Sequence, residues 1–296
     1  MVMAIYIATR RTVKNRKELK RVINFEDLGS IPYIKEKKRK KKVKNNGVHL
    51  NSDRVSQLYL EEIRKLRIKV LREMEKTGSK SLLVTSSIPG EGKTTLSVNL
   101  ALTIAKQGKR VILVDCDPRN PSVAHCMGEK NVYPGIGAVL RGRAELEEAL
   151  ETVEVTEGSL KIMYGGKPNS KATRLLGAPE MERVIRRLEK MADVVILDTA
   201  PAGLLADAVA LAKYVDSAIY VVKHDYAKKW QIRDGAQALA MSGIKVLGFV
   251  FNGDRNKKSG GYGYGYKRYG YGYGYGYGYG YYGNRKDDGS GRVIKD

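Results

Sequence analysis

Several features that mark common protein classes are scarce in this chain of 296 residues. Two cysteines, Cys116 and Cys126, are too few for a disulfide framework or a zinc site. No run of about 18 apolar residues is present, which argues against a membrane-spanning helix. The first ten residues lack the cleavage-like site of a secretory signal. A reducing cytoplasm is therefore the expected location.

Positive charge is abundant and is concentrated toward the ends of the chain, for a formal net charge of +22. Residues 1–76 carry 22 basic and 9 acidic side chains, whereas residues 77–256 carry 24 and 20. The nearly balanced middle is typical of a packed domain, and an apolar share of 42% is enough for a core. The run 35–44 holds eight basic residues in ten positions and indicates either an anionic partner or a solvated linker.

The pattern divides the chain into three parts. Residues 1–50 lack sustained periodicity and are interpreted as a basic N-terminal arm, and residues 51–256 as the folded domain. A helix is predicted near residues 55–75, with Ser52 as its cap. Its expected helical stripe is partial and lies amid charged residues; it comprises Val55, Leu58, Tyr59, Glu62, Leu66, Ile68 and Leu71. Residues 257–296 are rich in Gly-Tyr dipeptides, whose glycines cost backbone entropy, so this tail is expected to be disordered.

Apolar strands alternate with helices through the middle of the chain. Strands are predicted at 82–85, 111–114, 194–197, 218–222 and 246–251, and helices at 92–106, 145–153, 180–190 and 228–241. Such apolar strands separated by helices indicate an α/β fold with a mostly parallel sheet that helices cover on both faces.

The segment Ser87-Ile-Pro89-Gly90-Glu91-Gly92-Lys93-Thr94-Thr95 follows a predicted strand and opens a predicted helix, the context that a P-loop requires. Its glycines let backbone N–H groups point at phosphate oxygens, and the helix N-terminus adds partial positive charge. Lys93 would reach the β- and γ-phosphates of ATP, and the Thr94 hydroxyl would bind Mg²⁺. Ser87 stands where the general pattern has its first glycine. The segment predicts a P-loop NTPase whose loop residues bind ATP and Mg²⁺.

Acidic residues follow two of the predicted strands. Asp115 and Asp117 come at the end of one strand, and Asp198 ends another. Because ligands of parallel sheets bind beyond the carboxyl ends of the strands, these carboxylates are expected near the P-loop. One such residue alone is often only a turn former or a cap, but three beside one P-loop favour a role with Mg²⁺.

Together these segments resemble the Walker A, A′ and B motifs of the bacterial tyrosine kinases, which are cytoplasmic kinases of capsule and exopolysaccharide export. The resemblance rests on Lys93-Thr94, on 115–121 and on 198–201, is supported by 166–169 and 207–212, and covers roughly residues 52–296. One departure is Ala200, where the family commonly has proline.

The resemblance implies an ATP-dependent, non-specific protein-tyrosine kinase. It makes Asp115 the candidate general base, with Asp117 and Asp198 organising Mg²⁺ beside Thr94. Whether Asp115 serves as base, as metal ligand or as both stays open. Asn252, at the end of the last predicted strand, is expected to hydrogen-bond the adenine.

The resemblance also implies an assembly. Glu61, Arg64 and Arg67 lie along one helix face, where they form either a local surface pair or the contact that closes a ring of subunits, often of eight. The tail is expected to be the autophosphorylation cluster, and a Gly-rich chain of 40 residues has a root-mean-square reach of about 30–40 Å, enough to serve an adjacent subunit. The candidate acceptors are Tyr262, Tyr264, Tyr266, Tyr269, Tyr271, Tyr273, Tyr275, Tyr277, Tyr279, Tyr281 and Tyr282.

Further partners follow from the same resemblance. A separate transmembrane adaptor that controls polysaccharide chain length would activate the kinase and hold it at the inner face of the membrane. A phosphotyrosine phosphatase and protein substrates of polysaccharide synthesis are also expected, and nucleic acid is not.

Two alternatives to the kinase interpretation remain. A partitioning or cell-division ATPase would switch on DNA or membrane, but it carries an extra lysine where this chain has Ile88. A non-enzymatic scaffold would use the Gly-Tyr tail for condensation or for stacking on single strands.

Overall fold

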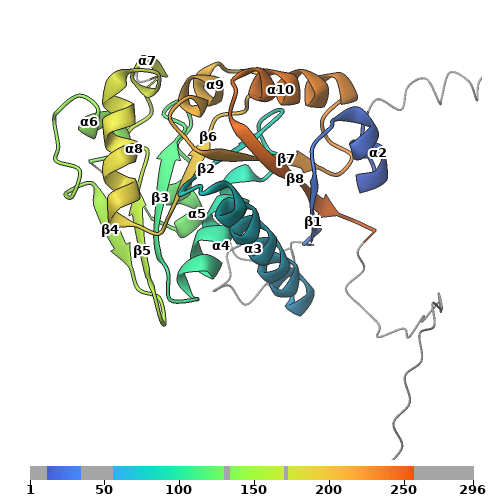
Figure 1. Cartoon of the computed structure of the whole chain (residues 1–296), viewed down its shortest axis with the longest axis horizontal. Coiled ribbons are helices and arrows are strands. Elements are labelled where there is room, and N and C mark those ends of the chain that lie inside the picture. Colours follow the sequence, from blue (N-terminus) through green and yellow to red (C-terminus); the bar gives the residue numbers. More distant parts are fainter. Residues whose placement is uncertain (1–11, 35–55, 130–133, 170–172, 257–296) are drawn as a thin grey trace, which may run out of the picture. The chain divides into compact units, whose positions relative to one another are not determined.

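The computed structural model describes residues 12–34, 56–129, 134–169 and 173–256, and these ranges form a layered α/β structure (Figure 1). Its sheet has eight strands in the order β1-β8-β7-β2-β6-β3-β5-β4. Every described pairing is parallel except that between β4 and β5. The strands are β1 (Asp27–Pro32), β2 (Ser81–Ser86), β3 (Arg110–Cys116), β4 (Leu150–Val153), β5 (Ser159–Met163), β6 (Val194–Thr199), β7 (Ser217–Lys223) and β8 (Lys245–Asp254).

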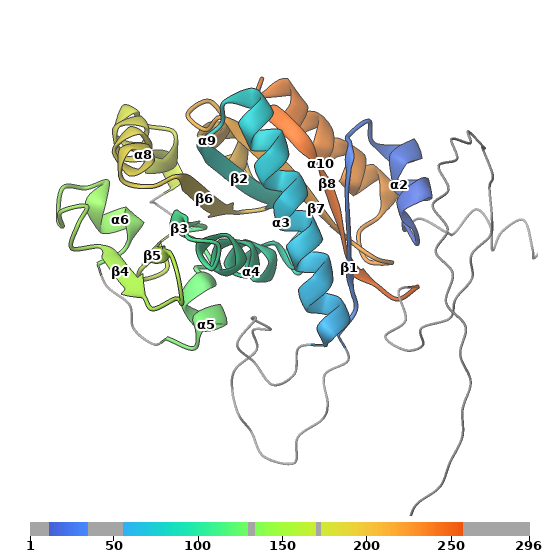
Figure 2. The same cartoon turned by 60° about the horizontal axis from the view of Figure 1, so that its bottom comes forward.

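Helices cover both faces of the sheet (Figures 1 and 2). One face carries α3 (Gln57–Thr77), α4 (Lys93–Ala105) and α5 (Val123–Met127), which share one apolar cluster with the sheet. The second apolar cluster lies under the helices of the other face. Those helices are α2 (Arg16–Val22), α6 (Ile136–Val139), α7 (Thr173–Leu176), α8 (Pro179–Met191), α9 (Asp207–Ala212) and α10 (Lys229–Met241). The predicted α/β class with a mostly parallel, doubly covered sheet is confirmed.

The central strands place the candidate site at one edge of the sheet. β2, β3 and β6 are parallel neighbours in the centre and are almost entirely buried. Their carboxyl ends therefore meet at the same edge, with Asp115 paired in register with Asp198. The first turn of α4 begins at that edge, directly after β2. The five predicted strands are confirmed, with β2, β3, β6, β7 and β8 each extending a little beyond its predicted bounds.

The predicted helix over residues 145–153 is wrong. Residues 150–153 form strand β4, which pairs antiparallel with β5, and the residues before it form turns. The β-branched Thr152 and Val153 favour an extended backbone, and pairing with β5 outweighs the helix-favouring Glu and Leu residues upstream. Strand β5 itself was not predicted.

The predicted arm over residues 1–50 is also wrong for residues 12–34. Helix α2 begins after Asn15, whose side chain caps it by accepting the N–H of Glu18. Strand β1 then adds to the sheet parallel to β8. Its register shifts twice, and it contains a glycine with φ of 134° and a proline. An edge strand tolerates such residues, and they hide the usual alternation in the sequence.

Helix α3 confirms the predicted helix, with two corrections. Its cap is Ser56, which accepts the N–H of Tyr59 at 3.2 Å, whereas Ser52 and Val55 lie outside the described residues. The buried face also differs from the predicted stripe: Ile68 is 58% exposed. The residues that α3 buries are Tyr59, Ile63, Leu66, Val70 and Met74. Packing against β1 and α4 selects this face, and β1 was not part of the prediction.

Candidate functional site

The P-loop joins β2 to α4 and wraps around the N-terminus of that helix. Gly90 and Gly92 have φ of 83° and 89°, a left-handed backbone that glycine adopts without strain. Pro89 and Gly90 are exposed at the tip of the loop, whereas Thr95 lies half-buried in the first turn of α4. The N–H groups of that first turn have no partner within the helix, so they face an anion-binding position.

Glu91 shapes this loop from inside. Its side chain is fully buried, and one carboxyl oxygen accepts the N–H of Ser87 at 2.6 Å and of Ile88 at 2.9 Å. The other oxygen accepts the N–H of Lys223 at 3.1 Å. Burial raises the pKa of Glu91, and these hydrogen bonds act in the opposite direction. The Glu91 carboxyl thus holds the loop by accepting the N–H of Ser87, and the role of Ser87 and Glu91 toward ATP stays a prediction.

Asn252 lies against the same loop. Its side-chain amide donates to the Glu91 carbonyl at 2.8 Å, and a Cβ added to Gly92 would stand 2.2 Å from its Nδ2. Lys223 donates from Nζ to the Gly90 carbonyl at 3.0 Å. The ends of β7 and β8 therefore support the loop, and the role of Asn252 toward adenine stays a prediction.

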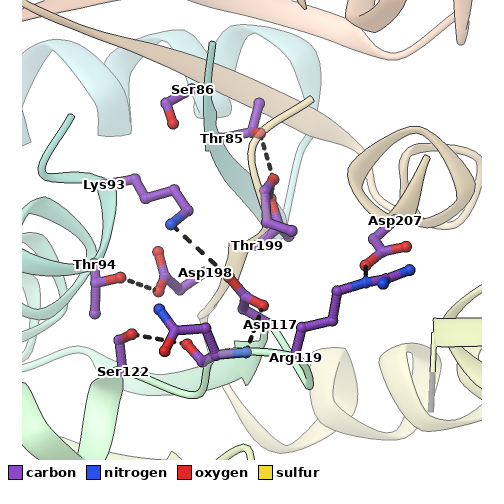
Figure 3. Close-up of polar contacts among 12 residues, drawn as sticks. Thr85, Ser86, Lys93, Thr94, Asp117, Arg119, Ser122, Asp198, Thr199 and Asp207 are labelled. Atoms are coloured by element: carbon purple, nitrogen blue, oxygen red, sulfur yellow. Dashed lines mark hydrogen bonds and ion pairs between the residues drawn. The ribbon is translucent and has the colours of Figure 1, made fainter. Parts of the chain in front are cut away.

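Asp198 meets the start of α4 (Figure 3). The Thr94 hydroxyl donates to its Oδ2 at 2.6 Å, and the Ser97 hydroxyl donates to its Oδ1 at 3.0 Å. Asp198 is fully buried. Burial raises its pKa, and the charge of Lys93 together with the two hydroxyl donors opposes that rise.

The other two predicted carboxylates lie at the end of β3. Lys93 Nζ stands 4.0 Å from Asp117 Oδ2, and both side chains are about nine-tenths buried (Figure 3). Asp115 is fully buried, and burial followed by the charge of Asp198 raises its pKa to about 7. Its Oδ1 accepts the N–H of Asp117 at 3.1 Å. Its Oδ2 accepts the N–H groups of Ser122 and Val123, each at 2.9 Å.

The donor set fits Mg²⁺ bound together with a nucleotide. In the described ranges no three His, Cys, Asp or Glu side chains gather into a protein-only metal site. A hydroxyl and a carboxylate do meet at Thr94 and Asp198, beside Asp117. Mg²⁺ is usually held by one or two such oxygens together with water and substrate phosphates. The structure therefore brings together Lys93, Thr94, Asp115, Asp117 and Asp198, as the sequence predicted.

The predicted assembly residues lie apart from this site, on α3. Glu61 and Arg64 are exposed and form an ion pair of 3.6 Å. Arg67 instead turns inward and donates to the Thr103 carbonyl at 3.3 Å. The eleven predicted acceptor tyrosines and the basic run 35–44 lie outside the described residues.

Three contacts of the site were not predicted. The first is the contact of Ser97 with Asp198. Ser97 lies three residues after Thr94 on the same helix face, and this spacing could have indicated the contact. Arg119 pairs with buried Asp207 at 3.3 Å and ties the segment after β3 to α9 (Figure 3). Tyr220 OH lies 3.0 Å from Ser87 Oγ. The last two join distant segments, so no local pattern indicates them.

The fold and this site define a P-loop nucleotide-binding domain. Consistent with that class, the family model described as "AAA domain" matches residues 79–231. The chain is 33% identical over 183 residues to tyrosine-protein kinase YwqD of Bacillus subtilis, which covers 62% of this chain and 76% of that protein. It is 33% identical over 173 residues to tyrosine-protein kinase CpsD of Streptococcus pneumoniae, which covers 58% and 75%. The chain belongs to the family of bacterial tyrosine kinases.

Solved structures agree on the fold. The kinase domain of Escherichia coli tyrosine kinase ETK superposes with a TM-score of 0.70 at 23% identity, covering 82% of this chain and 96% of that one. The chimerical protein CapA2B2 gives 0.68 at 22% identity, covering 81% and 99%. Among the helices of the described ranges, none is both long and apolar enough to span a membrane.

Proposed function

We propose that this protein is an ATP-dependent protein-tyrosine kinase that phosphorylates the C-terminal tyrosines of a neighbouring copy. One observation carries the proposal: Lys93, Thr94 and three carboxylates at the carboxyl ends of β3 and β6 meet at the start of α4. Membership of the bacterial tyrosine kinases supports tyrosine as the acceptor, and the eleven tyrosines between residues 262 and 282 supply acceptors.

The P-loop and α4 bind the triphosphate of ATP. Free N–H groups at the start of the helix and the Lys93 ammonium group offset the charge of the β- and γ-phosphates. Thr94, Asp117 and Asp198 would hold Mg²⁺, which when bound neutralises charge on the transferring phosphoryl group. Ser97 keeps Asp198 oriented by occupying its second oxygen.

The acceptor hydroxyl loses its proton as it attacks. Its oxygen forms a bond to the γ-phosphorus while the bond from that phosphorus to the β–γ bridging oxygen breaks, which yields phosphotyrosine and ADP. Free tyrosine has a pKa of about 10, so a carboxylate must accept the proton during transfer. We assign this to Asp115, whose Oδ1 accepts one N–H and keeps a lone pair.

Assembly and setting complete the proposal. Glu61 and Arg64, both about half exposed, leave their outer surface available to a second subunit and support a ring in which the tail of one copy enters the site of the next. A separate transmembrane adaptor would activate this ring at the membrane, a phosphotyrosine phosphatase would reverse its modification, and the output would be control of capsule or exopolysaccharide synthesis. That setting follows from the family.

Intact-protein mass spectrometry tests the proposal. The purified full chain is incubated with Mg²⁺ and ATP beside Lys93→Met. We expect a ladder of steps of about 80 Da, confined to the tail and absent from the variant. If an adaptor fragment is added and still no ladder forms, the kinase proposal fails. The switch ATPase would then be tested by binding of the chain to DNA and to lipid vesicles.

A further inference from the structure

A cavity lies where β5 ends, next to Asp115. It has a volume of about 220 Å³ and is formed by the turn after β5 and by α6 with the turn that follows it. Gly165 lines the cavity, and a Cβ on this glycine would stand only 3.3 Å from the carboxyl carbon of Asp115. A single glycine therefore separates the cavity from the proposed base.

The cavity is basic. Among the described residues, Arg141, Arg143 and Lys167 line it, and no aspartate or glutamate does. All three side chains are exposed, and none of them forms an ion pair or hydrogen bond with another residue of the part of the chain that the structure describes. Three uncompensated positive charges around a small hollow attract a compact anion. We call this hollow the basic cavity.

Glycines let the segments that form the basic cavity pack closely. A Cβ on Gly135 would stand 2.4 Å from the Gly166 nitrogen, and one on Gly165 would stand 2.7 Å from the Pro121 side chain. The segment before α6 can approach the turn after β5, and that turn can approach Pro121, this closely only because both positions lack side chains. The exposed cations lie around these closely packed segments.

We propose that the basic cavity binds the phosphate of a tyrosine already phosphorylated in the tail of a neighbouring copy while the next tyrosine occupies the site at Asp115. The inference rests on the proposed kinase function and adds to it an order in which the tail tyrosines are phosphorylated. A first phosphate primes transfer to its neighbours, so phosphates accumulate along the repeat rather than at random.

Size and charge match this ligand. A cavity of about 150 Å³ holds a benzene ring, so 220 Å³ accommodates a phosphorylated phenol ring. A phosphotyrosine carries about −1.5 to −2 charges at neutral pH. Arginine forms charge-assisted, often bidentate hydrogen bonds with phosphate. The nucleotide phosphates have their own position at the P-loop, so the basic cavity remains for a second anion.

The spacing of the tail matches as well. Tyrosines from Tyr269 to Tyr281 recur at every second position. In an extended chain such residues point the same way and lie about 6.4–6.8 Å apart. Lys267-Arg268 interrupts the alternation, so Tyr266 and Tyr269 are three positions apart. Priming should therefore run within residues 269–281 and not cross that interruption.

Peptide kinetics test the proposal. The enzyme is the full chain with its eleven tail tyrosines changed to phenylalanine, and the substrates are peptides of residues 269–279 with or without phosphotyrosine at Tyr273. We expect a KM at least tenfold lower for the phosphopeptide, with new phosphate at Tyr271 or Tyr275. Changing Arg141, Arg143 and Lys167 together to glutamine should remove the preference. Changing Arg183, Lys190 and Lys245, which are also exposed, to glutamine should not.

Two outcomes overturn the inference: equal KM values in the parent enzyme, or a preference that survives in the cavity variant. Thermal denaturation establishes that both triple variants fold. If neither peptide is phosphorylated, the kinase function has failed, and the basic cavity is judged separately by fluorescence anisotropy of labelled peptides without ATP. Tighter binding of the phosphopeptide that the cavity variant loses supports the cavity, and equal binding of both peptides refutes it.

Discussion

Changing Asp115 to asparagine should make the stability of the metal-free protein less sensitive to pH. Asp115 has a pKa of about 7 in the folded protein, because it is buried and faces Asp198, and a reference value of 3.8 when unfolded. At pH values between 3.8 and about 7, Asp115 holds a proton in the folded state that it has released in the unfolded state. The contribution of Asp115 to stability is therefore complete below pH 3.8 and is lost as the pH rises through 7.

The size of the effect follows from the same two values. One pKa unit corresponds to about 1.4 kcal/mol, so raising the pH from 4.5 to 8 should cost the native protein about 3 kcal/mol through this group. Asparagine does not titrate, but its amide nitrogen cannot accept the backbone N–H groups that the carboxyl accepts, which adds a cost that does not depend on pH. The stability of the variant relative to the parent should therefore rise by about 3 kcal/mol from pH 4.5 to pH 8. Because the charges of Asp198 and Asp115 affect each other, the gain in stability reflects both carboxyl groups rather than Asp115 alone.

Urea denaturation with EDTA, at constant ionic strength and four pH values from 4.5 to 8, measures the difference. Asp193→Asn is the control. Arg110 lowers the pKa of that carboxyl at the surface, so its stabilising contribution is present at neutral pH and is lost as the pH falls. Its effect should be small and opposite in sign. A difference between parent and Asp115→Asn that stays constant across the range would refute the reasoning.

Three further predictions concern the loop and the assembly. Glu91→Ala leaves three N–H groups without acceptors. It should lower the free energy of unfolding, measured by urea denaturation, by about 2–4 kcal/mol, and it should weaken ATP binding measured by calorimetry. Unchanged values would contradict the role of Glu91. Gly92→Ala forces a left-handed alanine whose Cβ meets the amide of Asn252 at 2.2 Å; calorimetry should show at least tenfold weaker ATP binding. Changing Glu61 and Arg64 together to alanine should alter stability by under about 0.5 kcal/mol, because both are exposed. The same change should reduce the mass of the assembly measured by light scattering. An unchanged mass would count against the proposed ring.

The centre of the fold was predictable because its signals are local. Each of β2, β3, β6 and β7 is an apolar run bounded by polar residues, and α4 begins at a P-loop motif. The sheet edges were not predictable in this way. β1 contains a glycine and a proline and takes its place only by pairing with β8. β4 contains a Leu-Glu pattern that suits a helix until β5 is present to pair with it.

The site shows the same division between local and distant information. The sequence identified which carboxylates come together, because each follows a strand, but it placed Glu91 only among the loop residues that bind ATP. In the structure both Glu91 and Asp115 are buried and each accepts three backbone N–H groups. The donors differ: those of Glu91 come from the loop itself and from Lys223, more than 130 positions away, whereas those of Asp115 come from the next few residues of its own segment. Glu91 therefore ties the P-loop to β7, while Asp115 is fixed within its own segment beside Asp198 and Gly165. Of these two carboxylates, Asp115 is the one that lies next to the basic cavity, so we expect the acceptor tyrosine to bind there.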